Sequence, residues 1–177
     1  MIKALNRLKN SLISEGHVNE SQKIDSIIKN AGKKKKALYT AAFLTDAAKI
    51  ELKNWWRLKT KGELLQNEFA HHMTIKFKPS PDEVLAMPIG EPVTLTVIGY
   101  AEDESGQAVL VIPNGVISSN DIPHVTVSTA DGVRPVYSNE LLARGVEEVR
   151  DGPELGAIVG FHNGKEIRYD FDGSIYE

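Results

Sequence analysis

The N-terminal thirty residues repeat apolar positions with the period of an α-helix. Apolar residues recur three or four positions apart in two stretches, one before Gly16 and one after it. This spacing lines one face of a helix, so the pattern predicts a helical hairpin. The apolar positions are Ile2, Leu5, Leu8, Leu12, Ile13, Ile24, Ile27 and Ile28. Two such short helices bury little surface alone, so we expect the hairpin to mediate homo-oligomerisation or docking, or to pack on or tether the rest of the chain.

From residue 37 onward the pattern changes to short runs rich in β-branched and aromatic residues. These runs predict strands, several of them separated by turn residues. The predicted strands cover residues 37–44, 72–77, 93–100, 107–112, 124–128, 156–161 and 166–171. Thr45 and Asp46 are suited to cap a helix after the first strand, and Ser138 is suited to open a short helix later in the chain. Because strands and helices do not alternate regularly, the order predicts an α+β fold.

A boundary separates the predicted hairpin from this mixed region. Ala31 and Gly32 are typical of a helix end, and four consecutive lysines follow them. The sequence therefore predicts a hairpin at 1–32, a basic linker at 33–36 and a main domain at 37–177. The lysines are typical of a solvated linker, with a nucleic-acid contact as the alternative.

Composition and net charge exclude several kinds of ligand and functional site. The 177 residues suit one domain with a small appendage, and 41% hydrophobic with 25% charged residues is typical of soluble globular proteins. The formal net charge of -3 gives no overall basic field for long nucleic acid, which favours a small or short anionic ligand. The absence of cysteine excludes disulfides, zinc–thiolate sites and thiol nucleophiles. No run of apolar residues suits a targeting signal or a membrane span, so we expect a cytoplasmic protein without a membrane partner.

Two of the five histidines begin the same motif: a histidine, any residue, a threonine and an aliphatic residue. The copies occupy residues 72–75 and 124–127. Because side chains alternate across a strand, His72 and Thr74 emerge on one face, about 6.6 Å apart along the strand, and so do His124 and Thr126. A single copy would be typical of a packed histidine beside a strand-favouring threonine. Two copies among so few histidines favour a functional site.

The doubled motif suits the cleavage of a phosphodiester without a metal or another cofactor. An imidazole whose pKa lies near 6.5 serves as base or as conjugate acid at neutral pH, so two imidazoles can divide these roles. The threonine hydroxyls can donate to the non-bridging phosphoryl oxygens. The same strand faces extend to Lys76 and Ser128, which we expect to bind the substrate.

Three further side chains lie near these motifs in the sequence. Tyr39 is a candidate to stack on a base, whereas Phe43 on the same strand face is expected to be core. His71 would point away from His72 in a strand, so we expect it to be a bystander. For Ser138, helix capping is favoured over contact with substrate.

These residues resemble a known family. The paired motifs, together with the segments 38–44, 70–75 and 120–128, are similar to the two-histidine phosphoesterases, which include RNA ligase-like cyclic phosphodiesterases, phosphodiesterase domains of RNA-repair ligases and phage nucleases that destroy cyclic-nucleotide immune signals. The resemblance spans about residues 37–145 and is strongest to the RNA-repair and phage branches. The 52 positions between the two histidines indicate a reduced lobe between the motifs and a more open pocket.

The resemblance implies a pseudo-symmetric fold with two lobes, antiparallel sheets and a central cleft. It also implies catalysis by His72, Thr74, His124 and Thr126 without a metal, on 2',3'-cyclic phosphates, 2',5'-linked oligonucleotides or cyclic nucleotides. A phage-encoded member would act in the host cytoplasm. The alternative is a module on the same fold that captures a nucleotide or an RNA end without cleaving it.

Overall fold

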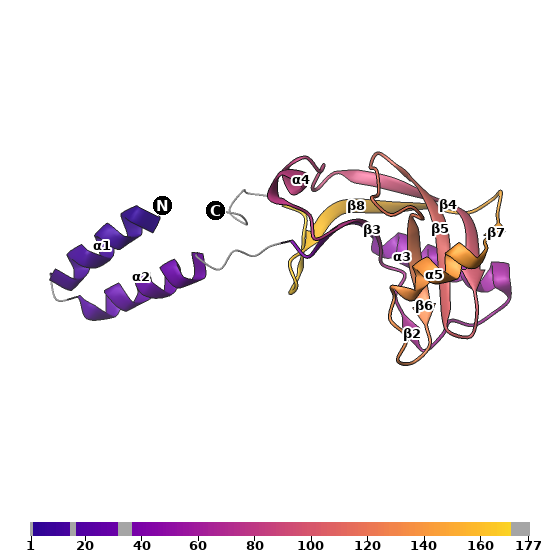
Figure 1. The fold of residues 1–177 in the computed structure, drawn as a ribbon, viewed down its shortest axis with the longest axis horizontal. Coiled ribbons are helices and arrows are strands. Elements are labelled where there is room, and N and C mark those ends of the chain that lie inside the picture. The colour runs from indigo at the N-terminus through magenta and orange to yellow at the C-terminus, as the bar shows by residue number, and fades with distance from the viewer. Residues whose placement is uncertain (1, 15–16, 32–36, 171–177) are drawn as a thin grey trace. The chain divides into compact units, whose positions relative to one another are not determined.

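The computed structural model describes residues 2–14, 17–31 and 37–170. These residues form two compact units, the N-terminal helices and the mixed region that begins at Ala37 (Figure 1). The predicted basic linker lies outside the described residues. Within the described residues, no helix is both long and apolar enough to cross a membrane.

The N-terminal unit contains helices α1 (Ile2–Ser14) and α2 (Val18–Ala31), which contact each other. At the turn, the His17 amide donates to the Leu12 carbonyl at 2.8 Å. The predicted pair of helices is confirmed. Leu8, Ile13 and Val18 each remain more than half exposed, and a role of this unit in oligomerisation or docking stays a prediction.

The second unit is built on one antiparallel sheet whose main strands close into a ring. Going round the ring, the order is β4-β5-β6-β3-β1-β8, and β8 pairs back with β4. The six strands are β1 (Tyr39–Leu44), β3 (His72–Phe77), β4 (Pro92–Glu102), β5 (Gly106–Asn114), β6 (His124–Thr129) and β8 (Glu154–His162). Short strands extend the sheet at β2 (Asn67–Glu68), β7 (Glu147–Glu148) and β9 (Ile167–Arg168). The last of these is shorter than the strand predicted over residues 166–171.

The ring consists of two equivalent halves. One half consists of β3, β1 and β8, and the other of β6, β5 and β4. The two strands that carry the motifs, β3 and β6, are neighbours at one junction between the halves. The halves meet where β3 pairs with β6, through the single register pair Met73 and Val125, and again where β4 pairs with β8. The predicted α+β fold with two pseudo-symmetric lobes is confirmed, with the difference that the lobes share one continuous sheet.

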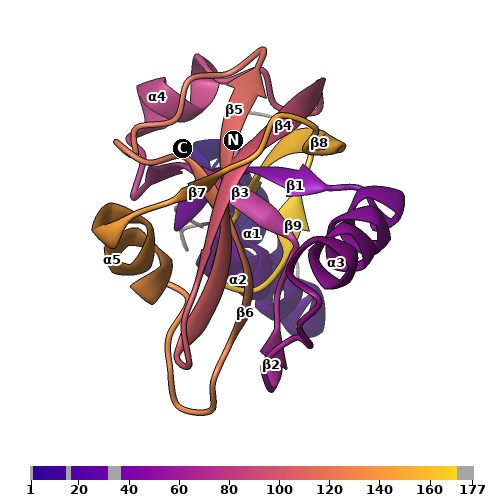
Figure 2. The same ribbon diagram turned by 90° about the vertical axis from the view of Figure 1, so that its right-hand side faces the viewer.

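Three helices flank the ring, and Figure 2 shows α3 (Asp46–Thr60) and α5 (Tyr137–Arg144) on opposite sides of the strands. The third, α4 (Pro81–Leu85), follows β3. As predicted, Thr45 caps α3, since its hydroxyl accepts a hydrogen bond from the Ala48 amide at 3.2 Å. Helix α3 is followed by its C-cap Lys61, which adopts a left-handed conformation with φ 54°.

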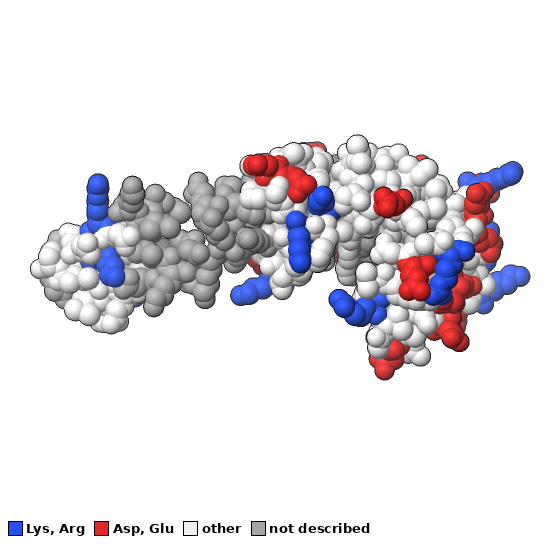
Figure 3. Space-filling view, in the orientation of Figure 1, with Lys and Arg blue, Asp and Glu red and all other residues white. Residues whose placement is uncertain are grey.

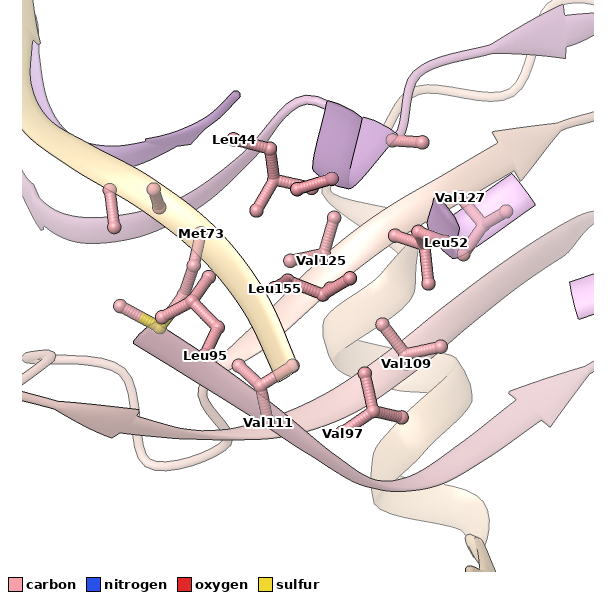
Figure 4. Close-up of a cluster of buried hydrophobic side chains, with 14 of the residues drawn as sticks. Leu44, Leu52, Met73, Leu95, Val97, Val109, Val111, Val125, Val127 and Leu155 are labelled. Carbon is pink, nitrogen blue, oxygen red and sulfur yellow. The ribbon is translucent and has the colours of Figure 1, made fainter. Parts of the chain in front are cut away.

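The main core is formed by one face of the strands together with one face of α3 (Figure 4). Alternate strand residues are fully buried there, among them Met73 and Ile75 of β3 and Val125 and Val127 of β6. From α3, the buried side chains include Leu52 and Trp56, neither of which is exposed to solvent. Because side chains alternate along a strand, burial of these residues places the motif histidines and threonines on the opposite face.

Candidate active site

A cavity of about 650 Å³ lies over the junction between β3 and β6. Both copies of the motif contribute to it, so the structure brings together the four residues predicted to be catalytic. Tyr39 of β1 also lines this cavity. The lining residues are Tyr39, Phe69, His71, His72, Thr74, Phe77, Asn120, His124, Thr126, Arg134, Pro135, Val136 and Asn139.

His124 is held by a backbone carbonyl. Its Nδ1 lies 2.7 Å from the Ile122 oxygen, and because a carbonyl only accepts, Nδ1 must carry the hydrogen. The neutral ring therefore has its lone pair on Nε2. Burial lowers the pKa of His124, and the bond to Ile122 acts in the opposite direction.

His72 has a different partner, because its Nδ1 lies 2.5 Å from Nδ1 of His71. The planes of these two rings lie within 26° of each other with centroids 4.4 Å apart, and Tyr39 stacks on His72 at 5.2 Å. Burial, followed by the nearby His71, His124 and His162, lowers the pKa of His72 to about 3. The ring is therefore neutral at neutral pH.

Tyr39 lies between two histidines in a series of stacked rings. Besides its contact with His72, its ring stacks on His162 at 5.3 Å with an interplanar angle of 7°. Burial raises the pKa of Tyr39. Tyr39 thus lines the cavity, and its described ring contacts orient His72. Its stacking on a substrate base stays a prediction.

Thr126 contacts the first turn of α5. Its hydroxyl lies 2.8 Å from the Ser138 hydroxyl and also donates to the Pro135 carbonyl at 3.3 Å. The expectation that Ser138 caps the helix is wrong, because α5 begins at Tyr137 and its N-cap, Val136, makes no side-chain capping bond. The Ser138 side chain is buried against β6 instead.

The loop before β6 is attached to β3 through its backbone. The Ser118 hydroxyl donates to the Thr74 carbonyl at 2.9 Å, and the Ser119 amide donates to the Ile75 carbonyl at 2.7 Å. These bonds bring Asn120 to the cavity wall. The sequence placed Asn120 in a segment that resembles the family but assigned it no role, because its position at the cavity depends on this contact between distant segments.

Lys76 and Ser128 do not line the cavity, and one irregularity explains both differences. On β3, Thr74 pairs with Ala41 and Lys76 pairs with the adjacent Thr40, so the register shifts directly after the motif threonine. On β6, the register with β5 shifts in the same way between Thr126 and Ser128. Such a bulge changes the direction of the next side chains.

Each displaced side chain has partners elsewhere. The Lys76 ammonium lies 3.3 Å from the Glu83 carboxylate at the start of α4. Ser128 is fully buried, donates to the Gln107 side chain and accepts from the Leu65 amide at 3.1 Å. The prediction that Ser128 binds substrate is therefore wrong, and the structure gives Lys76 no place in the cavity.

Two further residues of the cavity were not predicted to be functional. His71 lines the cavity, contrary to the expectation that it points away, because it precedes β3 and follows Ala70, whose φ of 49° redirects the backbone. Arg134 lies in the loop after β6 and is the one Lys, Arg, Asp or Glu among the described lining residues. In the sequence, the one feature that could have indicated either residue is its position near a motif.

The cavity therefore combines one permanent positive charge with aromatic walls. Phe69 and Phe77 contribute apolar surface, and Phe77 is 58% exposed. A guanidinium attracts a phosphate and aromatic rings can stack on bases, so the arrangement suits an anionic group attached to a planar ring.

Comparison with solved structures gives 46 matching chains. One of them is described as "Crystal Structure of Fungal RNA Kinase", with 10% sequence identity and a TM-score of 0.44. That alignment covers 89% of this chain and 58% of the other, so the chain spans less than two thirds of that structure. No curated protein matches the chain.

A family model gives more specific information. The model of the fungal tRNA ligase phosphodiesterase domain matches residues 92–167. The matched segment runs from the start of β4 to the start of β9 and includes the second motif, with His124 and Thr126, and Arg134. The first motif lies outside it, on the equivalent strand of the other half of the ring. This match and the doubled motif at one cavity both support membership of the two-histidine phosphoesterase superfamily.

Proposed function

We propose that this protein is a phosphodiesterase that hydrolyses nucleotide phosphodiesters by acid–base catalysis, with a 2',3'-cyclic phosphate at an RNA end as its preferred substrate. The observation that carries the proposal is that two His-x-Thr pairs, from separate halves of the sheet, line one cavity. The match to a tRNA ligase phosphodiesterase domain supports the RNA end as substrate.

The environments of the histidines suggest different roles. His72, whose pKa is lowered to about 3, is neutral and can accept a proton from the attacking water. His124, whose Nδ1–H donates to a carbonyl, is better suited to carry a second proton on Nε2, since that partner favours its charged form. An anionic phosphodiester in the cavity would raise the pKa of both rings.

The chemical step is then a single displacement at phosphorus. The water oxygen forms a bond to phosphorus while its proton passes to His72. The bond from phosphorus to one ribose oxygen breaks, and that oxygen takes the proton of His124. Thr74 and Thr126 donate hydrogen bonds to the non-bridging oxygens, and the Arg134 guanidinium attracts the phosphate.

The surface charge favours a short substrate. In the part of the chain that the structure describes, Lys and Arg side chains on the face shown in Figure 3 are scattered among Asp and Glu and form no continuous basic track. Binding of long nucleic acid relies on many such cations. The local charge of the cavity therefore supports recognition of a strand end, a mononucleotide or a short oligonucleotide.

The test is a cleavage screen in EDTA. The substrates are a short RNA with a 2',3'-cyclic phosphate end, 2',3'-cyclic mononucleotides, 2',5'-linked oligoadenylate, ADP-ribose cyclic phosphate and cyclic di- and trinucleotides. We expect the parent protein to open the cyclic RNA end and the His72→Ala/His124→Ala protein to be inactive. His17→Ala, at the turn between α1 and α2, is the matched control. Turnover only with added metal would contradict the proposal, and tight binding without turnover would assign a capture module instead.

A further inference from the structure

The hydrogen bond between His71 and His72 joins two imidazole Nδ1 atoms, and each of these atoms can be either the donor or the acceptor. With the Nδ1 atoms 2.5 Å apart, one hydrogen lies between them, so one ring donates while the other accepts. If His72 donates, its Nε2 carries the lone pair. If His71 donates, Nε2 of His72 carries a hydrogen and cannot act as a base.

The equivalent bond of the second motif has no such ambiguity. His124 donates to the Ile122 carbonyl, which accepts in every protonation state of the protein. An imidazole nitrogen accepts only while it is unprotonated. The two motifs thus hold their histidines in chemically different ways.

We propose that His71 is a positioning residue that accepts the Nδ1 hydrogen of His72 and thereby fixes the tautomer with the Nε2 lone pair available to substrate. This inference rests on the proposed function, since it assigns His72 the role of base. Once His72 takes a proton at Nε2, its Nδ1–H still needs an acceptor, and His71 supplies it.

The surroundings of His71 favour the neutral acceptor form. Burial lowers the pKa of His71, and Lys49 of α3 and His162 of β8 lower it further, whereas a hydrogen bond to its own backbone acts in the opposite direction. Lys49 also pairs with Asp46 at 2.9 Å. Phe69 contacts the His71 ring edge-on, with centroids 6.5 Å apart.

Other ionisable groups face the ring of His72. His124 of β6 and His162 of β8 are close enough to lower the pKa of His72, and the Tyr39 hydroxyl belongs to the ring stacked on it. No carboxylate is among the described residues that line the cavity. Protonation of His71 at acidic pH would remove the acceptor, so we expect an acidic limb in the pH dependence of kcat that depends on His71.

The direct test is long-range ¹⁵N–¹H NMR of the imidazoles in the full chain without substrate. We expect His72 to carry its hydrogen on Nδ1 and His71 on Nε2 at pH 7.5. The reverse assignment, or hydrogens on Nε2 of both rings, would overturn the proposal. This readout needs no turnover, so it separates the positioning role from the proposed activity, which the EDTA screen tests.

Two variants extend the test to kinetics. His71→Phe keeps an aromatic ring without an acceptor, and His71→Asn places an acceptor oxygen near the Nδ1 position. We expect His71→Phe to lower kcat on the order of 10-fold or more, with a smaller change in KM, and His71→Asn to retain most of kcat. His162→Phe is the control for the tautomer of His72, because it removes a neighbouring ring that does not bond to His72. Equal kcat in the parent and His71→Phe would contradict the proposal.

Discussion

The Ser138 hydroxyl lies 2.8 Å from the Thr126 hydroxyl, which connects the first turn of α5 to the second motif. Ser138 is 1% exposed, so water does not replace this contact. The proposed mechanism uses the Thr126 hydroxyl as a donor to phosphate, so its one hydrogen must turn from the Pro135 carbonyl to the substrate, and Ser138 is then the donor that holds the Thr126 oxygen in place.

Removal of the Ser138 hydroxyl is therefore expected to affect the chemistry. We expect Ser138→Ala to lower kcat about 5-fold, equivalent to about 1 kcal/mol, because Thr126 loses an orienting partner. Steady-state kinetics on the cyclic RNA end measure the effect. Thr129→Val is the matched control, since Thr129 on the same strand is buried and donates to the Val133 carbonyl at 2.9 Å. An equal fall in kcat in both variants would refute the role of Ser138.

Arg134 offers a test of phosphate binding. We expect Arg134→Ala to raise KM about 10-fold or more with a smaller change in kcat, and to weaken the dependence of KM on salt, because the cavity loses its permanent positive charge. Arg57→Ala is the control, since Arg57 lies on α3 and pairs with Glu63 at 3.8 Å. If KM and its salt dependence match the parent, Arg134 does not bind the phosphate.

The lowered pKa of His72 makes stability depend on pH. Its pKa falls from 6.5 to about 3 on folding, so below pH 6.5 the unfolded chain binds a proton that the folded chain does not. The contribution of His72 to the free energy of unfolding is therefore highest above pH 6.5, and it decreases as pH falls toward 3. Between pH 6.5 and 5 we expect a loss of roughly 2 kcal/mol in the free energy of unfolding, which urea titrations would measure. A smaller loss in His72→Gln is expected, and an identical loss would exclude His72 as the source.

Ser128 is expected to affect stability alone. Ser128→Ala leaves the Leu65 amide and the Gln107 side chain each without one hydrogen-bond partner, so the free energy of unfolding should fall by about 1–3 kcal/mol. Urea titration measures this fall, and the KM for the cyclic RNA end should not change. A raised KM with unchanged stability would restore the sequence-based expectation that Ser128 contacts substrate.

The part of the site that the sequence predicted depends on local alternation. His72 and Thr74 share a face because Met73 and Ile75 are buried on the other side, and period two captures this relationship. Alternation fails at Lys76 and Ser128, because each follows a bulge that forms only when the strands pair.

The remaining differences arise from long-range contacts. The ring closes through β3 with β6 and β4 with β8, which are not consecutive in the chain, so the predicted strands did not determine their order. Ser138 looks like a helix cap in isolation, and only the packing of α5 on the sheet reveals its bond to Thr126. His71 depends in the same way on the unusual backbone of Ala70.

The central claim is that His72 and His124 act as one acid–base pair in a shared cavity. Single-turnover rates of His72→Ala, His124→Ala and the double variant, measured in EDTA on an RNA with a 2',3'-cyclic phosphate end, test it most directly. We expect each single variant to lose about 10²–10⁴-fold, and the double variant to lose little more than either, because residues that act as a unit are not additive. A rate within about 10-fold of the parent for either single variant would contradict the claim.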